Sequence, residues 1–199
     1  MSGPFDDWTN DDLAALIAAH PLAWVVTHGE RFRATPLPIL LERDAGGAPV
    51  SLIGHFGRSN PQLDAVYADR HALFLFQGPH RYISPDMAGR PDWGPTWNYA
   101  IARIEAEIDL DPAFNDEAVA RLIAAMERDR PDPWTADQLG ARYDALIRHI
   151  VAFRARITHV DARFKLGQDE ADAVFDTIVD HLSGDPLAGW MQRMGRRGR

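Results

Sequence analysis

The spacing of apolar residues predicts strands mainly in the first part of the chain and helices mainly in the second. β-Branched and aromatic residues, or an alternation of apolar and polar residues, predict strands at residues 22–28, 31–42, 50–56, 71–76, 97–110 and 151–160. Apolar residues spaced three and four apart predict helices at residues 115–128, 135–148 and 169–182.

Two further helices are expected in the first part of the chain. Thr9 and Asp12 form a helix start ahead of an apolar run, and Pro21 ends that helix. A loop leads into a short helix at residues 63–68. Because strands follow one another and helices are grouped, we predict an α+β fold, an antiparallel, Greek-key-like β-barrel with peripheral helices.

One segment follows neither pattern. Residues 78–95 are rich in glycine and proline and show no periodicity. They also carry His80, Tyr82 and Trp93, which is not the composition of a disordered segment. Since long loops inside compact domains are usually functional, we expect an ordered functional loop here.

Composition and charge narrow the functional classes. The 199 residues include no cysteine, which excludes disulfides, iron–sulfur clusters and thiolate zinc sites. The formal net charge of −8 argues against a general nucleic-acid-binding surface. The C-terminal arginines are a local exception: Arg193, Arg196, Arg197 and Arg199. A signal-peptide pattern and a membrane-spanning apolar run are both absent from the sequence, so we expect a soluble, cytoplasmic protein.

Several chemical motifs are missing. The chain has no G-x-S-x-G, H-E-x-x-H or P-loop motif and no dinucleotide fingerprint. The eight histidines stand singly along the chain, so no metal site is expected. Lys165 is the only lysine, and all other basic residues apart from histidine are arginines. A coding bias explains this as well as a special role of Lys165 does.

Residues 34–40, ATPLPIL, read as a strand that contains two prolines. Pro36 and Pro38 lie two residues apart, so both remove an N–H donor from the same edge of the strand. The segment must therefore lie at a sheet edge or barrel rim. Thr35 and Leu37 face the opposite edge and can pair with a neighbouring strand or with a flat heterocycle. A protected edge strand without any ligand is the alternative.

Residues 54–62, GHFGRSNPQ, place a guanidinium, a hydroxyl and an amide in one loop ahead of the expected short helix. These groups are typical of a phosphate cradle, because charge-assisted donors favour a dianion. A capped turn with a surface arginine is the alternative.

Five blocks of sequence together resemble one known family. They are ATPLPIL, GHFGRSNPQ, FQGPHRYISP (residues 76–85), PTWNY (95–99) and RFKLGQ (163–168). In this order they closely resemble the PaiB-like family of FMN-binding negative transcriptional regulators, over about residues 4–182. Gly167 stands where the family usually has serine, and the chain from Asp185 onwards matches no family block.

The resemblance implies an FMN-binding split β-barrel over residues 1–184, followed by a basic C-terminal extension, 185–199. It implies a homodimer with FMN at the subunit interface. The ATPLP strand is expected along the isoalloxazine ring and the GHFGRSNPQ loop around the phosphate, while the later blocks close the site. The cofactor-binding residues expected from the matching blocks are Arg33, Ala34, Thr35, Pro36, Leu37, His55, Arg58, Ser59, Asn60, His80, Tyr82, Trp97, Asn98, Lys165 and Gln168.

Three kinds of function remain open at this point. The family name implies a regulator, but the acidic charge and the lack of a helix–turn–helix make direct DNA binding doubtful. An FMN-dependent oxidoreductase acting on a small molecule is the main alternative, and a flavin-binding module without turnover is the third. The substrate, effector and electron donor cannot be derived from the residues, and no membrane partner is expected.

Overall fold

The computed structural model describes residues 3–195 and consists of two compact units. Unit 1 comprises Met1–Leu16, Gln77–Ala102 and Asp161–Arg199. Unit 2 comprises Ile17–Phe76 and Arg103–Val160. The expectation of one domain over residues 1–184, followed by an extension, stays a prediction.

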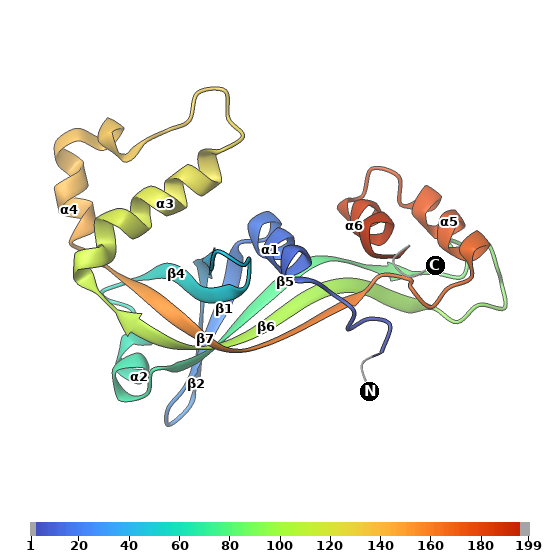
Figure 1. Cartoon of the computed structure of the whole chain (residues 1–199), viewed down its shortest axis with the longest axis horizontal. Helices are drawn as coiled ribbons and strands as arrows, with labels where there is room; N and C mark the ends of the chain where they lie inside the picture. Colours follow the sequence, from blue (N-terminus) through green and yellow to red (C-terminus); the bar gives the residue numbers. More distant parts are fainter. Residues whose placement is uncertain (1–2, 196–199) are drawn as a thin grey trace. The chain divides into compact units, whose positions relative to one another are not determined.

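Figure 1 shows the helices and strands in chain order. The strands are β1 (Leu22–His28), β2 (Phe32–Pro38), β3 (Leu40–Arg43), β4 (Pro49–Gly57), β5 (His71–Ile83), β6 (Thr96–Leu110) and β7 (Ile150–Lys165). The α-helices are α1 (Asn10–Ala19), α2 (Leu63–Ala68), α3 (Asn115–Glu127), α4 (Tyr143–Ile147), α5 (Asp172–His181) and α6 (Pro186–Gly195). Two 3-10 helices are η1 (Pro112–Phe114) and η2 (Ala136–Arg142).

Within the described residues, seven strands form a sheet in the order β2-β1-β5-β6-β7-β4-β3. The pairs β1–β2, β1–β5, β3–β4 and β4–β7 are antiparallel. Together with the grouped helices, this pairing confirms the predicted α+β class with an antiparallel sheet. The same residues contain no helix that is long and apolar enough to cross a membrane.

Aromatic side chains fill the core of unit 2. The ring centroid of Phe153 lies 5.3 Å from that of Phe56 and 6.1 Å from that of Phe74, and all three residues are buried. Gly54 is required beside them, because a Cβ at this position would lie 2.7 Å from both Ile39 and Phe153. The missing side chain thus leaves room for the side chains of Ile39 and Phe153 beside strand β4.

Helix α3 covers β4 in unit 2. Ala118 of α3 packs in one cluster with Ile53 of β4. The buried Asn115 fixes the start of the helix to β7, since its Oδ1 accepts a hydrogen bond from the Ala152 N–H at 2.7 Å. Its Nδ2 donates to the Ile150 carbonyl at 3.2 Å. The backbone groups at this end of β7 therefore find partners without a further strand.

In unit 1, α6 packs against the strand ends. Trp190 of α6 stacks on Phe164 of β7, with ring centroids 6.0 Å apart. Arg193 donates from Nε to the fully buried carboxylate of Asp12 at 3.0 Å. Residues 186–195, predicted as part of a basic extension, thus form a packed helix. The remaining arginines of the extension lie outside the described residues: Arg196, Arg197 and Arg199.

Three predicted elements need correction. Residues 78–83 were expected in a loop but continue strand β5, with Gly78 packed so tightly that a Cβ would lie 2.5 Å from Leu16. The helix expected at residues 135–148 is divided into η2 and α4, because Gly140 has a φ of 54°. Helix α6 was not expected, since its apolar residues lie between glycines and arginines near the chain end.

Candidate functional site

Strand β2 forms one edge of the sheet, as the two prolines predicted. It pairs with β1, with Pro36 opposite Trp24 and Pro38 opposite Leu22. Since prolines lack an N–H, this pairing is compatible only with proline nitrogens that face the outer edge. That edge offers the Ala34 N–H and the carbonyl oxygens of both prolines.

A hydrogen-bonded cluster joins β2 to the loop of residues 57–62. The Thr35 hydroxyl donates to Gln62 Oε1 at 2.6 Å and accepts from Asn60 Nδ2 at 3.0 Å. Gln62 is 1% exposed, and its Nε2 donates to the Val25 carbonyl at 2.9 Å and to Thr27 Oγ1 at 3.1 Å. Two sequence blocks that were predicted to share a site are thus in direct contact.

Arg58 and Ser59 lie on this loop with most of their polar groups uncommitted. The Arg58 N–H donates to the His149 carbonyl at 2.8 Å, and its Nε donates to the Arg148 carbonyl at 3.0 Å. Both Arg58 and Ser59 are exposed, and the Ser59 hydroxyl has no protein partner among residues 3–195. Arg58 is thus anchored through its backbone and Nε, while its terminal guanidinium nitrogens have no partner among the described residues.

His55 behaves differently from the loop arginine. Burial lowers its pKa, so its imidazole is neutral at pH 7. Its Nδ1 is buried without a hydrogen-bond partner among the described residues. A neutral histidine can donate one hydrogen bond but cannot act as a second cation beside Arg58.

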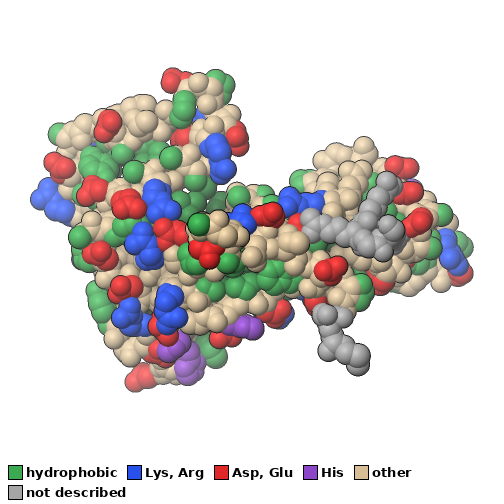
Figure 2. All heavy atoms as spheres, in the orientation of Figure 1, with side chains coloured by type: hydrophobic (Ala, Val, Ile, Leu, Met, Phe, Trp, Pro, Cys, Tyr) green, Lys and Arg blue, Asp and Glu red, His purple; other side chains and the backbone are tan. Residues whose placement is uncertain are grey.

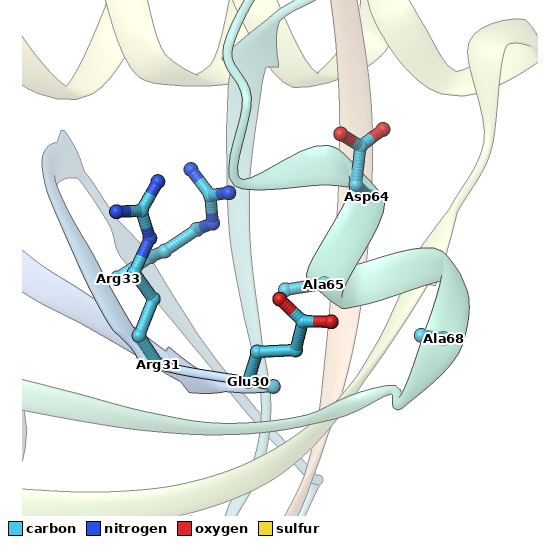
Figure 3. Close-up of a pocket in the computed structure, with 7 residues that line it drawn as sticks. Glu30, Arg31, Arg33, Asp64, Ala65 and Ala68 are labelled. Atoms are coloured by element: carbon cyan, nitrogen blue, oxygen red, sulfur yellow. The ribbon is translucent and has the colours of Figure 1, made fainter.

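A pocket of about 600 Å³ opens between the β1–β2 turn and α2 in unit 2 (Figure 3). Arg31 and Arg33 line one side of the pocket, and Glu30 and Asp64 also line it; in Figure 3 the Asp64 carboxylate points away from the arginines. Only Arg33 was among the predicted site residues. Arg31 precedes it by two residues, so the period-two alternation of extended chain could have found it.

The predicted aromatic residues of unit 1 lie together. The Trp97 ring centroid lies 6.3 Å from that of His80, nearly parallel, and 6.0 Å from that of Tyr82, edge-on. Trp97 and Tyr82 are among the most exposed large apolar residues. This cluster provides flat apolar surface on which a planar ring can stack.

The predicted polar residues of unit 1 already have partners within the chain. Lys165 Nζ donates to the Trp97 carbonyl at 3.0 Å and to Thr96 Oγ1. The Asn98 amide is buried and donates to Met191 Sδ at 3.6 Å. Gln168 accepts from the N–H of Leu166 and donates to the carbonyl of Phe164, which closes its own turn. Their roles as ligands of FMN stay predictions.

The expected site residues thus fall into two groups. Residues 33–37 and 55–60 belong to unit 2, and the remaining six belong to unit 1. No group of three or more metal-ligating side chains occurs in the part of the chain that the structure describes.

The residues of unit 2 fit the groups of FMN. The uncommitted guanidinium of Arg58 and the hydroxyl of Ser59 suit a phosphate, and the outer edge of β2 carries the donor and acceptors that a flavin ring edge needs. The buried hydrogen-bond cluster between them supplies the rigidity that orients both parts.

The chain is similar in sequence to a known bacterial protein. The protease synthase and sporulation protein PAI 2 of Bacillus subtilis (strain 168) is 27% identical over 136 residues, which span 67% of this chain and 65% of that protein. This chain therefore covers less than two thirds of that relative.

Solved structures support the split-barrel fold. An FAD- and haem-binding protein from Mycobacterium smegmatis aligns with a TM-score of 0.63 at 16% identity, covering 84% of this chain and 77% of that chain. The flavocytochrome Anf3 from Azotobacter vinelandii aligns with a TM-score of 0.54 at 14% identity, covering 79% and 67%. The predicted split β-barrel class is confirmed by this likeness.

The sequence profile described as "Putative FMN-binding domain" matches residues 2–159, which is most of the chain. The match contains four of the five blocks, and the block at residues 163–168 lies beyond it. FMN, the predicted cofactor, is confirmed by this match. The chain belongs to this FMN-binding domain family.

Proposed function

We propose that the chain holds FMN along strand β2, with the ring at residues 34–38 and the phosphate at residues 58–60. The observation that carries this proposal is the cluster of Thr35, Asn60 and Gln62, which fixes the edge strand to the loop. The same cluster leaves Arg58 and Ser59 available for a ligand.

The phosphate end gives most of the selectivity in this proposal. A phosphate monoester carries close to two negative charges at neutral pH, and charge-assisted hydrogen bonds to guanidinium are about twice as strong as neutral ones. The Nε bond from Arg58 to the Arg148 carbonyl holds the guanidinium in one orientation. Ser59 adds a neutral donor beside it.

The ring end depends on backbone groups. The Ala34 N–H and the carbonyl of Pro36 lie on an edge that no further strand can occupy regularly, because the prolines provide no donors. When bound, FMN supplies the redox chemistry of its isoalloxazine ring. The protein residues orient the ring and select it by the pattern of its donors and acceptors.

A second copy of the chain is the proposed partner of unit 2. Leu22, Trp24 and Phe32 are 63%, 50% and 74% exposed, and they lie on the paired strands β1 and β2. Large apolar side chains gathered at such exposure mark an interaction surface. A homodimer that covers them matches the expectation from the family.

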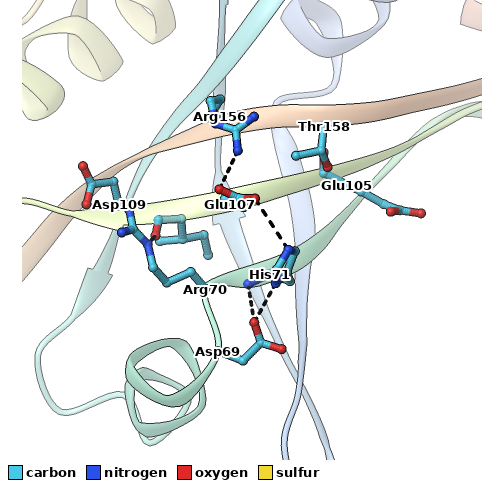
Figure 4. A network of polar contacts seen from close by, with 9 residues as sticks. Asp69, Arg70, His71, Glu105, Glu107, Asp109, Arg156 and Thr158 are labelled. Atoms are coloured by element: carbon cyan, nitrogen blue, oxygen red, sulfur yellow. Dashed lines mark hydrogen bonds and ion pairs between the residues drawn. The ribbon is translucent and has the colours of Figure 1, made fainter.

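A charged network lies beside this apolar surface (Figure 4). Asp69 accepts from His71 Nδ1 at 2.7 Å, and this hydrogen bond raises the pKa of His71. His71 Nε2 lies 3.6 Å from Glu107, which also pairs with Arg156. Mixed charges at the edge of an apolar patch are typical of an interface rim. Sedimentation at micromolar concentration tests the dimer, and a monomer under all conditions contradicts it.

The test of the flavin site compares FMN with riboflavin, which lacks the phosphate. Arg58→Ala is expected to weaken FMN binding by about 1.5–3 kcal/mol and to leave riboflavin nearly unaffected. Arg128→Ala is the matched control, because Arg128 is an exposed arginine of the same unit at the end of α3. Fluorescence titration measures both ligands. Equal losses for FMN and riboflavin contradict a phosphate contact of Arg58.

Oxidoreductase activity on a small molecule is the second candidate function. The exposed cluster of His80, Tyr82 and Trp97 favours it, because an exposed aromatic surface suits a planar substrate as well as a flavin ring. Anaerobic addition of NADH or NADPH to the flavin-loaded protein tests it by loss of flavin absorbance. No reduction by either donor supports a binding module instead.

Direct regulation through DNA has weaker support. Arg193 is bound to Asp12 and lies over the Trp190 ring. On the face shown in Figure 2, lysine and arginine side chains are interspersed with aspartate and glutamate rather than gathered in one basic patch. An indirect role, through a protein partner or through an effector that the protein consumes, agrees better with the acidic charge.

A further inference from the structure

The pocket between the β1–β2 turn and α2 contains four charged side chains that do not pair with one another. Arg31, Arg33, Glu30 and Asp64 all line it, and no ion pair or hydrogen bond joins their side chains to any described residue. Glu30, Arg31 and Asp64 are exposed and Arg33 is half-buried, so these groups remain available to a ligand from solvent. Figure 3 shows both arginines on the side of the pocket opposite α2.

The flavin phosphate proposed above does not account for this pocket. None of residues 57–60 lines it, and Arg58 is tied through Nε to the Arg148 carbonyl. Arg31 lies in the turn before β2, outside the segment proposed for the ring. The pocket therefore offers a second position for an anion.

The two arginines that line the pocket suit a phosphate, because a guanidinium can donate two parallel hydrogen bonds to its oxygens. The carboxylates of Glu30 and Asp64 repel a simple dianion and favour a ligand that also has hydroxyl or amino donors. The volume of about 600 Å³ exceeds the needs of a phosphate ion.

The remaining residues that line the pocket have small side chains or none. Ala65 and Ala68 of α2 line one side of the pocket, and Gly29, which has no side chain, also lines it. A flat ring can lie against such a wall without displacing side chains. Phosphate, hydroxyl donors and a flat ring together describe a nucleotide.

We propose that this pocket binds a ribonucleoside phosphate, with the phosphate on Arg31 and Arg33 and the ribose hydroxyls on Asp64 or Glu30. Its relevance to turnover depends on the proposed flavin site, because Arg33 directly precedes the segment proposed for the ring. Two sources share this chemistry. One is the adenylate half of a dinucleotide flavin, and the other is a reducing dinucleotide.

The first experiment titrates the FMN-loaded full chain with 5′-AMP, adenosine and inorganic phosphate by calorimetry. AMP is expected to bind more tightly than either fragment. Arg31→Ala is expected to weaken AMP by about tenfold to a hundredfold, with adenosine unchanged. Arg31→Lys, which keeps the charge but loses the paired donors, is expected to recover only part of the affinity. Arg128→Ala serves as the control and is expected to leave AMP binding unchanged.

Three results would overturn the proposal. The proposal is wrong if AMP does not bind the FMN-loaded chain. It is also wrong if Arg31→Ala leaves the affinity for AMP unchanged. FMN binding that falls in Arg31→Ala, while riboflavin binding is unchanged, assigns the pocket to the phosphate of FMN itself. Failure of the flavin proposal is recognised separately, because wild-type protein then binds neither FMN nor riboflavin.

Competition distinguishes the two sources of the nucleotide. Displacement of AMP by FAD, with FMN lost in the same titration, indicates a dinucleotide cofactor. Displacement by NADPH with FMN retained indicates a reductant, and Arg31→Ala is then expected to raise the apparent KM for NADPH with little change in kcat. AMP that neither dinucleotide displaces indicates a free nucleotide as the ligand.

Discussion

Two regions that share the predicted flavin residues are built in different ways. In unit 2, hydrogen bonds among Thr35, Asn60 and Gln62 hold strand and loop together, while the terminal guanidinium nitrogens of Arg58 have no partner among the described residues. In unit 1, the polar residues Lys165 and Gln168 are used within the chain, and the exposed surface is aromatic.

The difference shows that a polar residue in a binding motif can act in either of two ways. It can contact the ligand, or it can hold the segment that does. The arrangement in unit 2 suits an anion with fixed geometry, whereas the aromatic cluster in unit 1 suits any planar ring. The two regions are therefore expected to respond to different ligands and substitutions.

The largest expected effect comes from removing the buried amide of unit 2. Gln62→Ala leaves the Val25 carbonyl and the Thr27 hydroxyl without their donor, so the free energy of unfolding is expected to fall by about 3 kcal/mol. The matched substitution in unit 1, Gln168→Ala, is expected to cost about 1 kcal/mol, because its partners lie in a less buried turn. Urea unfolding monitored by circular dichroism measures both.

The comparison fails if the order of these two losses is reversed. The contrast between the two units is strengthened if Gln62→Ala also lowers the affinities for FMN and riboflavin by equal amounts. Such a result is expected from a residue that positions the strand and loop without touching the phosphate.

The sequence identified which polar segments of unit 2 come together, but it did not show which of their residues hold the segments in place. The double proline identified β2 as an edge strand because proline lacks a donor, which is a local property of the residue. By contrast, the cluster around Gln62 depends on contacts with Val25 and Thr27, about 35 residues away in the chain. No local pattern reports such contacts.

Unit 1 was harder to predict for a different reason. Glycine and proline at residues 78–95 indicated a loop, yet Gly78 lies within strand β5, and its glycine is explained by Leu16, which leaves little room for a side chain. Helix α6 was missed because its burial depends on Phe164 and Asp12, which come from distant segments. In both cases tertiary contacts overrode the local preference.

The stability of unit 2 at acid pH provides a second test, through the ion pairs of Glu42. Partial burial opposes ionisation of Glu42, but hydrogen bonds from Arg154, Ser51 and Arg121 lower its pKa to about 2. A lowered pKa stabilises the folded state fully above the usual value of 4.5, and the contribution is lost as pH falls towards 2. At neutral pH the contribution is at most about 3 kcal/mol.

The measurement compares the wild-type chain with Glu42→Gln between pH 6 and pH 2. The difference in the free energy of unfolding is expected to be largest at pH 6 and to shrink steadily below about pH 4.5. A difference that stays constant with pH would mean that the substitution changes only the packing of this side chain. The ion pairs of Glu42 would then contribute little to stability.

A smaller effect is expected from the aromatic cluster of unit 1. Trp97→Ala is expected to weaken FMN and riboflavin by the same amount, about 1 kcal/mol, because stacking does not involve the phosphate. Trp134→Ala, a half-exposed tryptophan of unit 2, is the control and is expected to leave both affinities unchanged. A loss restricted to FMN would assign a phosphate contact to unit 1 and remove the contrast between the regions.

The smallest effect is expected from the C-terminal arginines beyond α6. Truncation after residue 195 removes Arg196, Arg197 and Arg199 but keeps Arg193, whose bond to Asp12 supports the packing of α6. FMN affinity and stability are therefore expected to be unchanged.

Any DNA binding through these three charges is expected to show a slope of log affinity against log salt of at most about −2.7. A steeper slope, or DNA binding that survives the truncation, would locate a nucleic-acid contact on the folded units despite their acidic charge. Electrophoretic mobility measured over a range of salt concentrations, with and without the three residues, decides between these outcomes.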